Sequence, residues 1–175
     1  MTEAEYQTAF SLWTLAASPL IVDADVRNLS DFQRRTLLHP EMLAIHHDKG
    51  ARGGSRVGLG LCSSVNSSSL LSSSPSSSES SSSLSSVTTS TCTTQVWAKP
   101  LAGNTTAIAL YNSANTSSTL AFSFALLGEV SSRLHVRDVW GQQDLGTSVG
   151  SFRTPFAVEP HGTAVLVVSH NGSTY

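Results

Sequence analysis

The chain has 175 residues, a formal net charge of −2 and a hydrophobic fraction of 39%. This length allows one domain or one and a half, and the small charge gives no reason to expect nucleic acid or an anionic membrane as a partner. No apolar stretch is long enough to span a bilayer, and the acidic, polar residues 1–5 do not resemble a secretory signal.

Residues 2–48 predict helix, buried strand and helix. Thr2 and Glu5 have the spacing of a capping box. Apolar side chains then recur at helical spacing to about Ala17, namely Tyr6, Phe10, Leu12 and Trp13. Ser18-Pro19 stops this helix.

The short apolar run Leu20–Val22 is typical of a parallel strand covered on both faces. A second capping box opens at Ser30 and predicts a helix through Leu38, and Glu41–Ile45 adds one more turn after Pro40. A lone helix–strand–helix unit cannot close a sheet, so we expect it to be the last piece of a larger α/β domain. Without that domain, its apolar face has to pack on the rest of the chain, self-associate or stay mobile.

The middle of the chain changes composition twice. Lys49–Gly60 is glycine-rich and basic and is interpreted as a connector. Residues 61–94 are almost pure serine and threonine, and we expect disorder because so little apolar area cannot offset the entropy of ordering. The two cysteines, Cys62 and Cys92, lie at the ends of this tract. They are a candidate disulfide, and the alternative is two unpaired thiols.

From Gln95 the apolar pattern takes a period of two. It predicts strands at Val96–Leu101, Ala107–Tyr111, Thr119–Phe124, Arg133–Trp140, Ser148–Phe152 and Thr163–Ser169, with turns at Gly103-Asn104 and Gly141–Gly146. Short strands at such intervals favour an antiparallel β-sandwich. Its expected core is Val96, Ile108, Leu110, Leu120, Phe122, Val136, Phe152, Val165 and Val167. The predicted domains are thus 1–60, 61–94 and 95–175.

Asp23 and Asp25 are the most attractive candidates for chemistry. They follow the predicted strand at its carboxyl end, where barrel enzymes place catalytic groups, and paired carboxylates hydrolyse glycosides. The alternative, which the spacing favours, is that one carboxylate binds a neighbouring loop and the other caps a helix.

Three other groups of residues invite functional interpretations. His46-His47-Asp48 suggests a metal site, although adjacent residues rarely converge on one ion. His161 lies in a predicted turn, where bonds to the backbone are the simpler expectation. Lys49–Gly54 lacks the ending and the preceding strand of a phosphate loop. The residues alone therefore predict no metal, no cofactor and no active site.

Sequons begin at Asn28, Asn66, Asn104, Asn115 and Asn171. Because serine-rich sequence generates sequons by chance, Asn66 carries little weight. The candidate N-glycosylation sites are Asn28, Asn104, Asn115 and Asn171, and they favour a protein of the secretory pathway.

Several ordered motifs together are familiar. Residues 1–13 (MTEAEYQTAFSLW), 17–30 (ASPLIVDADVRNLS) and 95–101 (QVWAKPL) resemble stretches of the α-galactosidases, or melibiases, of glycoside hydrolase family 27. Residues 136–140 (VRDVW), 144–146 (DLG), 150–152 (GSF) and 160–162 (PHG) are similar to the family's last domain. The resemblance covers nearly all of the chain outside the serine tract.

The resemblance implies a (β/α)8 barrel followed by an antiparallel β-sandwich. This chain would hold the barrel's last helix–strand–helix elements and the whole sandwich. The family hydrolyses α-galactosides by a retaining double displacement without a cofactor, with one aspartate as nucleophile and another as acid and base. Neither motif occurs here, so the resemblance places no catalytic or substrate-binding residue in this chain.

The sequence also departs from the family pattern. Ala9 replaces a histidine, His46-His47-Asp48 replaces Asn-Gln-Asp, and the serine tract replaces a short connector. The resemblance implies a secreted, lysosomal or vacuolar whole protein that acts on an α-galactoside or an α-N-acetylgalactosaminide.

We expect the chain alone to be inactive and to self-associate through residues 1–60. The rival hypothesis is a non-catalytic sandwich that binds carbohydrate or a partner through Trp97 or Trp140. Those two side chains lie on predicted strands, where burial in the core is the simpler expectation.

Overall fold

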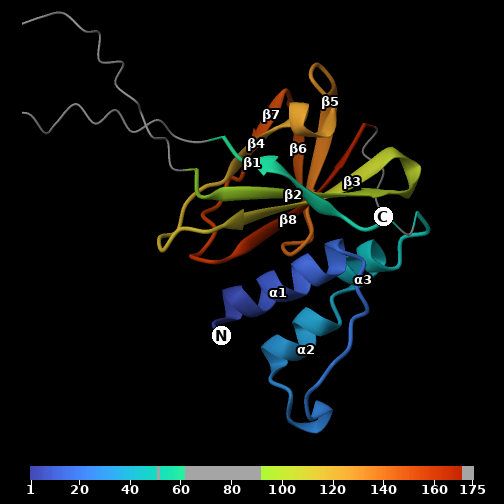
Figure 1. Ribbon diagram of the computed structural model, residues 1–175, viewed down its shortest axis with the longest axis vertical. Helices are drawn as coiled ribbons and strands as arrows, with labels where there is room; N and C mark the ends of the chain where they lie inside the picture. The colour runs from blue at the N-terminus through green and yellow to red at the C-terminus, as the bar shows by residue number, and fades with distance from the viewer. Residues whose placement is uncertain (51, 62–91, 171–175) are drawn as a thin grey trace, which may run out of the picture.

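The computed structural model describes residues 1–50, 52–61 and 92–170. Helices occupy one side of the molecule and strands the other (Figure 1). The helical elements of the first part are α1 (Glu3–Leu15), η1 (Val26–Asn28), α2 (Asp31–Leu37) and α3 (Pro40–His46). The strands are β1 (Ser55–Leu59), β2 (Thr94–Leu101), β3 (Thr105–Asn112), β4 (Ala121–Ser123), β5 (Arg133–Asp138), β6 (Gln143–Val149), β7 (Ser151–Arg153) and β8 (Thr163–Ser169). Two 3-10 turns, η2 (Ala102–Asn104) and η3 (Phe124–Leu127), lie between them.

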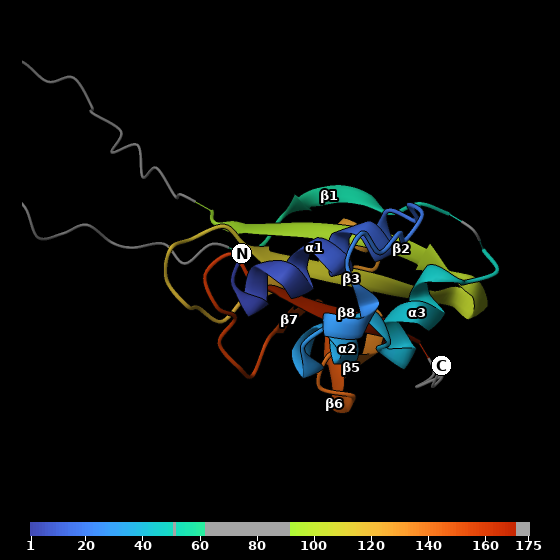
Figure 2. The same cartoon turned by 90° about the horizontal axis from the view of Figure 1, so that it is seen from below.

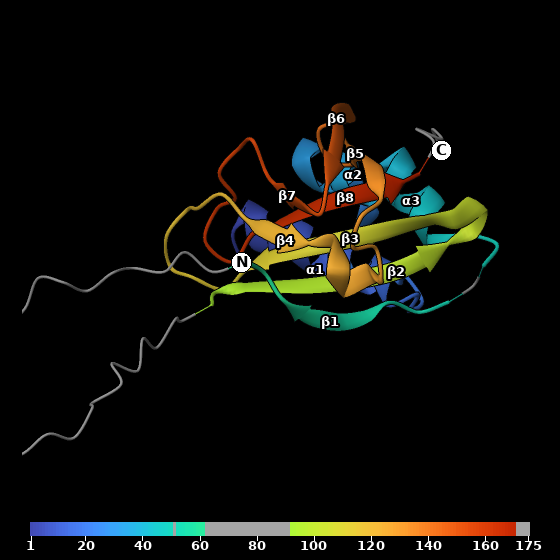
Figure 3. The same ribbon diagram turned by 90° about the horizontal axis from the view of Figure 1, so that it is seen from above.

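The described strands form two antiparallel sheets. The larger sheet has six strands in the order β1-β2-β3-β8-β5-β6, and β4 pairs with β7 in the smaller one. The small sheet covers one face of the large sheet (Figure 3), and α1 lies across the opposite face (Figure 2). The predicted antiparallel sandwich is confirmed.

Because both faces of the large sheet are covered, it separates two hydrophobic cores. The core between the sheets contains Val96, Ile108, Leu110, Leu120, Phe122, Phe124, Leu134, Val136, Val158, Ala164, Leu166 and Val168. The core between the sheet and the helices contains Phe10, Leu15, Met42, Ile45, Leu101, Ala107, Ala109, Val139, Val165 and Val167. Every residue of β8 is buried, as expected for a strand with a layer on each side.

The predicted core is right for six side chains and differs for three. Phe152 is only partly buried against the core between the sheets. Val165 and Val167 are buried on the opposite face, beneath the helices. Alternation along β8 requires this division, since neighbouring residues of a strand point to opposite faces.

The predicted helices are present with small shifts of their ends. Both capping boxes form, at Thr2 with Glu5 and at Ser30 with Gln33. The first helix ends at Leu15 rather than Ala17, because Ala17 adopts a left-handed conformation with a φ of 54°.

The predicted strand Leu20–Val22 does not form. The segment has no regular secondary structure, and Ile21 and Val22 are 84% and 46% exposed. A buried strand needs neighbours for its backbone groups, and no described segment pairs with this one.

The predicted connector Lys49–Gly60 contains a strand. Residues 55–59 form β1 and pair with β2 at the edge of the large sheet. Gly60 then lies so close to β4 that a Cβ atom there would be 2.5 Å from the carbonyl oxygen of Ala121. The glycines that suggested a connector thus allow close backbone approach, and the boundary predicted at residue 60 falls just after this strand.

Differences within the second half are local. The predicted turn Gly141–Gly146 holds the start of β6, and the predicted strand Ser148–Phe152 is split between β6 and β7 around Gly150. Gly150 has a φ of 74°, a value that favours glycine and ends the first of the two strands.

Candidate functional site

Asp23 and Asp25 lie in the exposed loop before η1. The Asp25 carboxylate caps η1 and accepts bonds from the guanidinium of Arg27 at 2.9 Å and 3.1 Å and from the amide of Asn28 at 2.9 Å. The hydrogen bond from Arg27 lowers the pKa of Asp25, which disfavours a role as general acid. Because the expected strand is absent, nothing places the two carboxylates together at the end of a sheet.

The three residues His46, His47 and Asp48 do not converge. The Nε2 of His46 is 2.9 Å from the carbonyl oxygen of Ser18, and the Nδ1 of His47 is 2.8 Å from that of Leu43. The carboxylate of Asp48 accepts from the backbone amides of Gly50 and Ala102. Within residues 1–50, 52–61 and 92–170, no group of three or more potential ligands is placed to hold a metal ion.

His161 and the segment Lys49–Gly54 have structural contacts. His161 has a φ of 56°, its carbonyl oxygen accepts from the hydroxyl of Thr8 at 2.9 Å, and its ring lies 3.5 Å from the hydroxyl of Tyr111. The amide of Gly54 donates to the carbonyl oxygen of Leu15 at 2.7 Å. That amide is therefore committed to the fold rather than to a phosphate.

The candidates for covalent modification lie partly outside the described residues. Cys62 and Asn171 lie outside the described residues. The pairing of Cys62 with Cys92 and the glycosylation of Asn171 therefore stay predictions. Asn28, Asn104 and Asn115 are exposed, and their glycosylation also stays a prediction. No helix in the described ranges is long and apolar enough to cross a bilayer.

A buried lysine joins the helices to the sandwich. Lys99 on β2 is fully buried, and its Nζ donates to the carbonyl oxygens of Ile45 at 2.7 Å, Thr14 at 3.4 Å and His46 at 3.5 Å. These carbonyls belong to the last turns of α1 and α3, where a cation is favourable. Burial lowers the pKa of Lys99, and the charge of Asp48 opposes that effect.

An ion pair makes a second connection between helices and strands. The guanidinium of Arg137 on β5 donates to both carboxylate oxygens of Glu41 on α3, at 2.6 Å and 3.0 Å. The hydrogen bond that Arg137 donates to Glu41 raises the pKa of Arg137. Lys99 and Arg137 hold the helices in place on the sheet, which makes residues 1–47 part of one folded unit with the sandwich.

The outer face of the helices carries an apolar groove of about 620 Å³. It is lined by Met1, Tyr6, Ala9, Phe10, Trp13, Pro19, Leu20, Ile21, Val22, Leu37, Leu38 and Leu43. Several of these side chains are largely exposed, including Ile21 at 84%, Leu38 at 65% and Trp13 at 56%. A contiguous apolar face of this kind marks an interaction surface, and we call it the helical groove.

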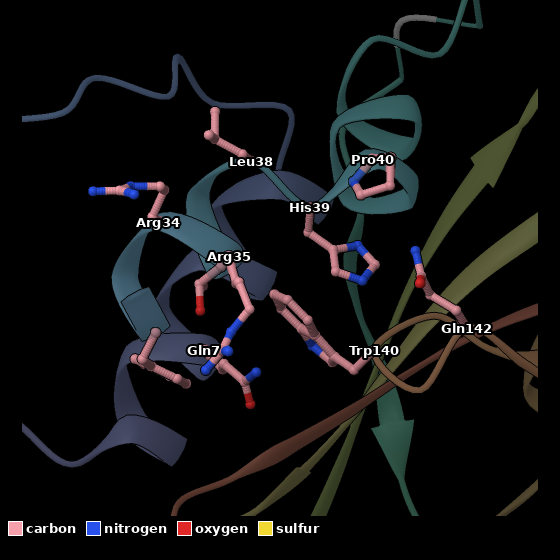
Figure 4. Close-up of a pocket in the computed structure, with 10 residues that line it drawn as sticks. Gln7, Arg34, Arg35, Leu38, His39, Pro40, Trp140 and Gln142 are labelled. Atoms are coloured by element: carbon pink, nitrogen blue, oxygen red, sulfur yellow. The ribbon is translucent and has the colours of Figure 1, made fainter. Parts of the chain in front are cut away.

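A second hollow, also about 620 Å³, lies where the helices meet the β5–β6 turn (Figure 4). Its walls are polar and aromatic and include Gln7, Arg35, His39, Trp140 and Gln142. We call it the Trp140 cleft. Of the two predicted tryptophan candidates, Trp140 lines this cleft, whereas Trp97 packs against the core beneath the helices with its Nε1 atom buried.

Sequence reasoning did not find the two polar connections between the helices and the sandwich. The alternation along β2 places Lys99 on the same face as Trp97 and Leu101, and this signal could have shown that the lysine points into a core. The pairing of Glu41 with Arg137 had no signal, because 96 positions separate the two residues.

The fold and the arrangement of surfaces define a class of protein. Helices that expose an apolar groove on their outer face, fixed to an antiparallel sandwich, indicate a sandwich domain with a helical face suited to packing against another protein part. Residues 91–168 match the family model described as the alpha galactosidase C-terminal beta sandwich domain.

Relatives with known names cover nearly the whole chain. A probable α-galactosidase of Dictyostelium discoideum is 27% identical over 170 residues, which are 97% of this chain and 37% of that protein. An α-galactosidase of rice is 27% identical over 173 residues, which are 98% of this chain and 33% of that protein. Among solved structures, α-galactosidase I of Mortierella vinacea has the same fold, with a TM-score of 0.73 and 19% identity over 100% of this chain and 38% of its own. The chain thus spans about a third of the length of the proteins it matches.

Residues 91–168 therefore form an α-galactosidase carboxyl-terminal β-sandwich domain, and nearly the whole chain is similar to the carboxyl-terminal part of the α-galactosidases (melibiases).

Proposed function

We propose that this chain is the non-hydrolytic carboxyl-terminal part of an enzyme that removes terminal α-D-galactosyl residues by a retaining double displacement. Two carboxylates acting on one glycosidic bond are needed for that reaction. The observation that carries the proposal concerns the one carboxylate pair that the sequence suggested: Asp25 of that pair is bound by Arg27 and Asn28 in an exposed loop, and its lowered pKa disfavours the role of general acid. The named relatives, three times as long, support the assignment of the whole protein.

The role of this chain in the whole protein is to support the catalytic part. The helical groove is mainly apolar, with no charged side chain among its lining residues and with the Tyr6 hydroxyl and the amino terminus of Met1 as its polar groups, so a mainly apolar occupant suits it. The sandwich fixes the groove through Lys99 and Arg137. We assign the groove to the catalytic part of the same protein, with a second copy of this chain as occupant when that part is missing.

The purified 175-residue chain tests the first half of the proposal. It should hydrolyse p-nitrophenyl α-D-galactopyranoside no faster than buffer, and the double variant Asp23→Asn, Asp25→Asn should behave in the same way. A rate above the blank that disappears in the double variant would show that these carboxylates catalyse the reaction, and the proposal would be wrong.

A further inference from the structure

The Trp140 cleft continues past its aromatic side chain. A further hollow of about 390 Å³ shares Gln7, Phe32 and Trp140 with the cleft. The two hollows therefore adjoin at Trp140, and we treat the pair as one groove with helical residues on one wall and sandwich residues on the other. Their sizes fall in the range of sites for small molecules.

Trp140 is held as a fixed platform in this groove. Its Nε1 donates to the Oγ of Ser11 at 3.2 Å. The ring of His39 packs edge-on against it with 4.9 Å between ring centroids, and the ring of Phe10 lies 6.4 Å away. Because these contacts prevent rotation of the half-buried indole, it offers a rigid apolar surface at little entropic cost to a ligand.

Three polar side chains around the indole of Trp140 have no hydrogen-bond partner among the described residues. The side chains of Gln7, Arg35 and Gln142 make no hydrogen bond or ion pair with any residue that the structure describes. In the view of Figure 4, the indole lies between Gln7 and Arg35 on one side and Gln142 on the other. Amide and guanidinium groups present paired donors or acceptors at a fixed spacing, which suits two neighbouring hydroxyl groups.

The charges of the groove do not favour an anion. Arg34 and Arg35 lie at one end, but the adjoining hollow is lined by the carboxylates Glu3, Asp138 and Glu159. His39 adds little positive charge, because burial lowers its pKa. A ligand that spans both hollows meets cationic side chains at one end and carboxylates at the other, and a neutral molecule with one apolar face and several hydroxyl groups suits this mixture.

We propose that the Trp140 cleft binds a neutral oligosaccharide of two or three sugar units. One pyranose ring stacks on the indole of Trp140, and Gln7, Arg35 and Gln142 bond its hydroxyl groups. This binding goes beyond the proposed function, since it needs neither the catalytic part of the protein nor an occupied helical groove.

Nuclear magnetic resonance of the full chain, labelled with ¹⁵N, tests the proposal. The three indole signals belong to Trp13, Trp97 and Trp140, and each is assigned with its Trp→Phe variant. Raffinose, maltotriose and cellotriose are titrated separately to about 20 mM, a range that detects millimolar affinity. At least one of them should shift the Trp140 signal saturably and leave the Trp97 signal in place.

Variants of exposed residues identify the groups that bind. Arg35→Ala and Gln142→Ala should each weaken binding about fivefold, the loss expected for one hydrogen bond. Arg56→Ala, on the exposed face of β1 away from the cleft, should leave binding unchanged. The proposal fails if none of the three sugars shifts the signal, or if Arg35→Ala and Gln142→Ala bind as well as the parent chain. A hyaluronan tetrasaccharide that binds more tightly than every neutral sugar would also overturn it, because the site would then select an anion.

Discussion

Lys99 is the residue on which the attachment of the helices depends most. Its buried ammonium group donates hydrogen bonds to carbonyl oxygens at the ends of two helices. A buried carbonyl oxygen that loses its donor destabilises the fold by more free energy than the hydrogen bond contributed to it.

We predict that Lys99→Met lowers the free energy of unfolding by about 2 kcal/mol, since methionine fills the space but donates no hydrogen bond. Urea denaturation measures this change. Lys49→Met is the matched control, because Lys49 is exposed, and it should be close to neutral. A loss for Lys99→Met no larger than that of the control would mean that the carbonyls do not need the lysine.

His39 gives the stability a dependence on pH. It caps α3 through its Nδ1, which accepts from the amide of Met42 at 3.4 Å. Burial lowers the pKa of His39, and the charge of Glu41 only partly opposes this. The unfolded chain therefore binds a proton more readily than the folded chain, and stability falls as the pH falls below the ordinary histidine pKa of about 6.5.

We predict that the stability of the parent chain falls between pH 7.5 and pH 5 more steeply than that of His39→Asn, because asparagine also caps a helix but does not titrate. Thermal or urea unfolding across this range gives both slopes. Parallel curves for the two proteins would contradict the assignment of the effect to His39.

At the scale of elements, α3 and β5 are joined by the two-point ion pair of Glu41 with Arg137. The two side chains are only 17% and 22% exposed, whereas those of the Asp25–Arg27 pair are 41% and 85% exposed. Both pairs have two bonds between guanidinium and carboxylate, so partial burial is what makes the first pair the stronger one.

A double-mutant cycle with Glu41→Gln and Arg137→Met should give a coupling energy of about 1 kcal/mol. The same cycle on Asp25→Asn and Arg27→Met should give a coupling near zero, because solvent screens exposed pairs. Equal couplings in the two cycles would show that the junction gains nothing from the Glu41–Arg137 pair.

How much the sequence revealed differs between elements. The capping boxes predicted the starts of two helices, and the apolar period of two predicted most strands. Both kinds of element are determined by local sequence patterns. The strand β1 was missed because its pairing with β2 lies across the serine tract, and its glycines suggested a loop. Leu20–Val22 was predicted as a strand because its apolar pattern suits a parallel neighbour, which no described segment supplies.

The same limit applies to the candidate site. The sequence named Trp140, but it did not predict that Ser11, His39 and Gln7 surround it, because tertiary packing from distant positions builds the cleft. Alternation divides β8 into two sets of residues, but the sequence could not show which set faces which core, since all the central residues of the strand are apolar.

At the scale of the whole molecule, we propose that the helical groove packs against another part of the protein. Exposing the apolar side chains of the groove to water costs free energy in proportion to their apolar area. Isolated chains should reduce that cost by pairing through the grooves, which gives a closed dimer.

Sedimentation velocity over a range of concentrations tests this claim most directly, with Ile21→Lys and Val130→Lys compared with the parent chain. Ile21 is 84% exposed in the groove, and Val130 is 71% exposed outside it, so neither change should disturb the fold. We predict that the parent chain and Val130→Lys form dimers at high concentration and that Ile21→Lys stays monomeric. A parent chain that is monomeric at every concentration, or an Ile21→Lys variant that associates as well as the parent, would contradict the assignment of the groove.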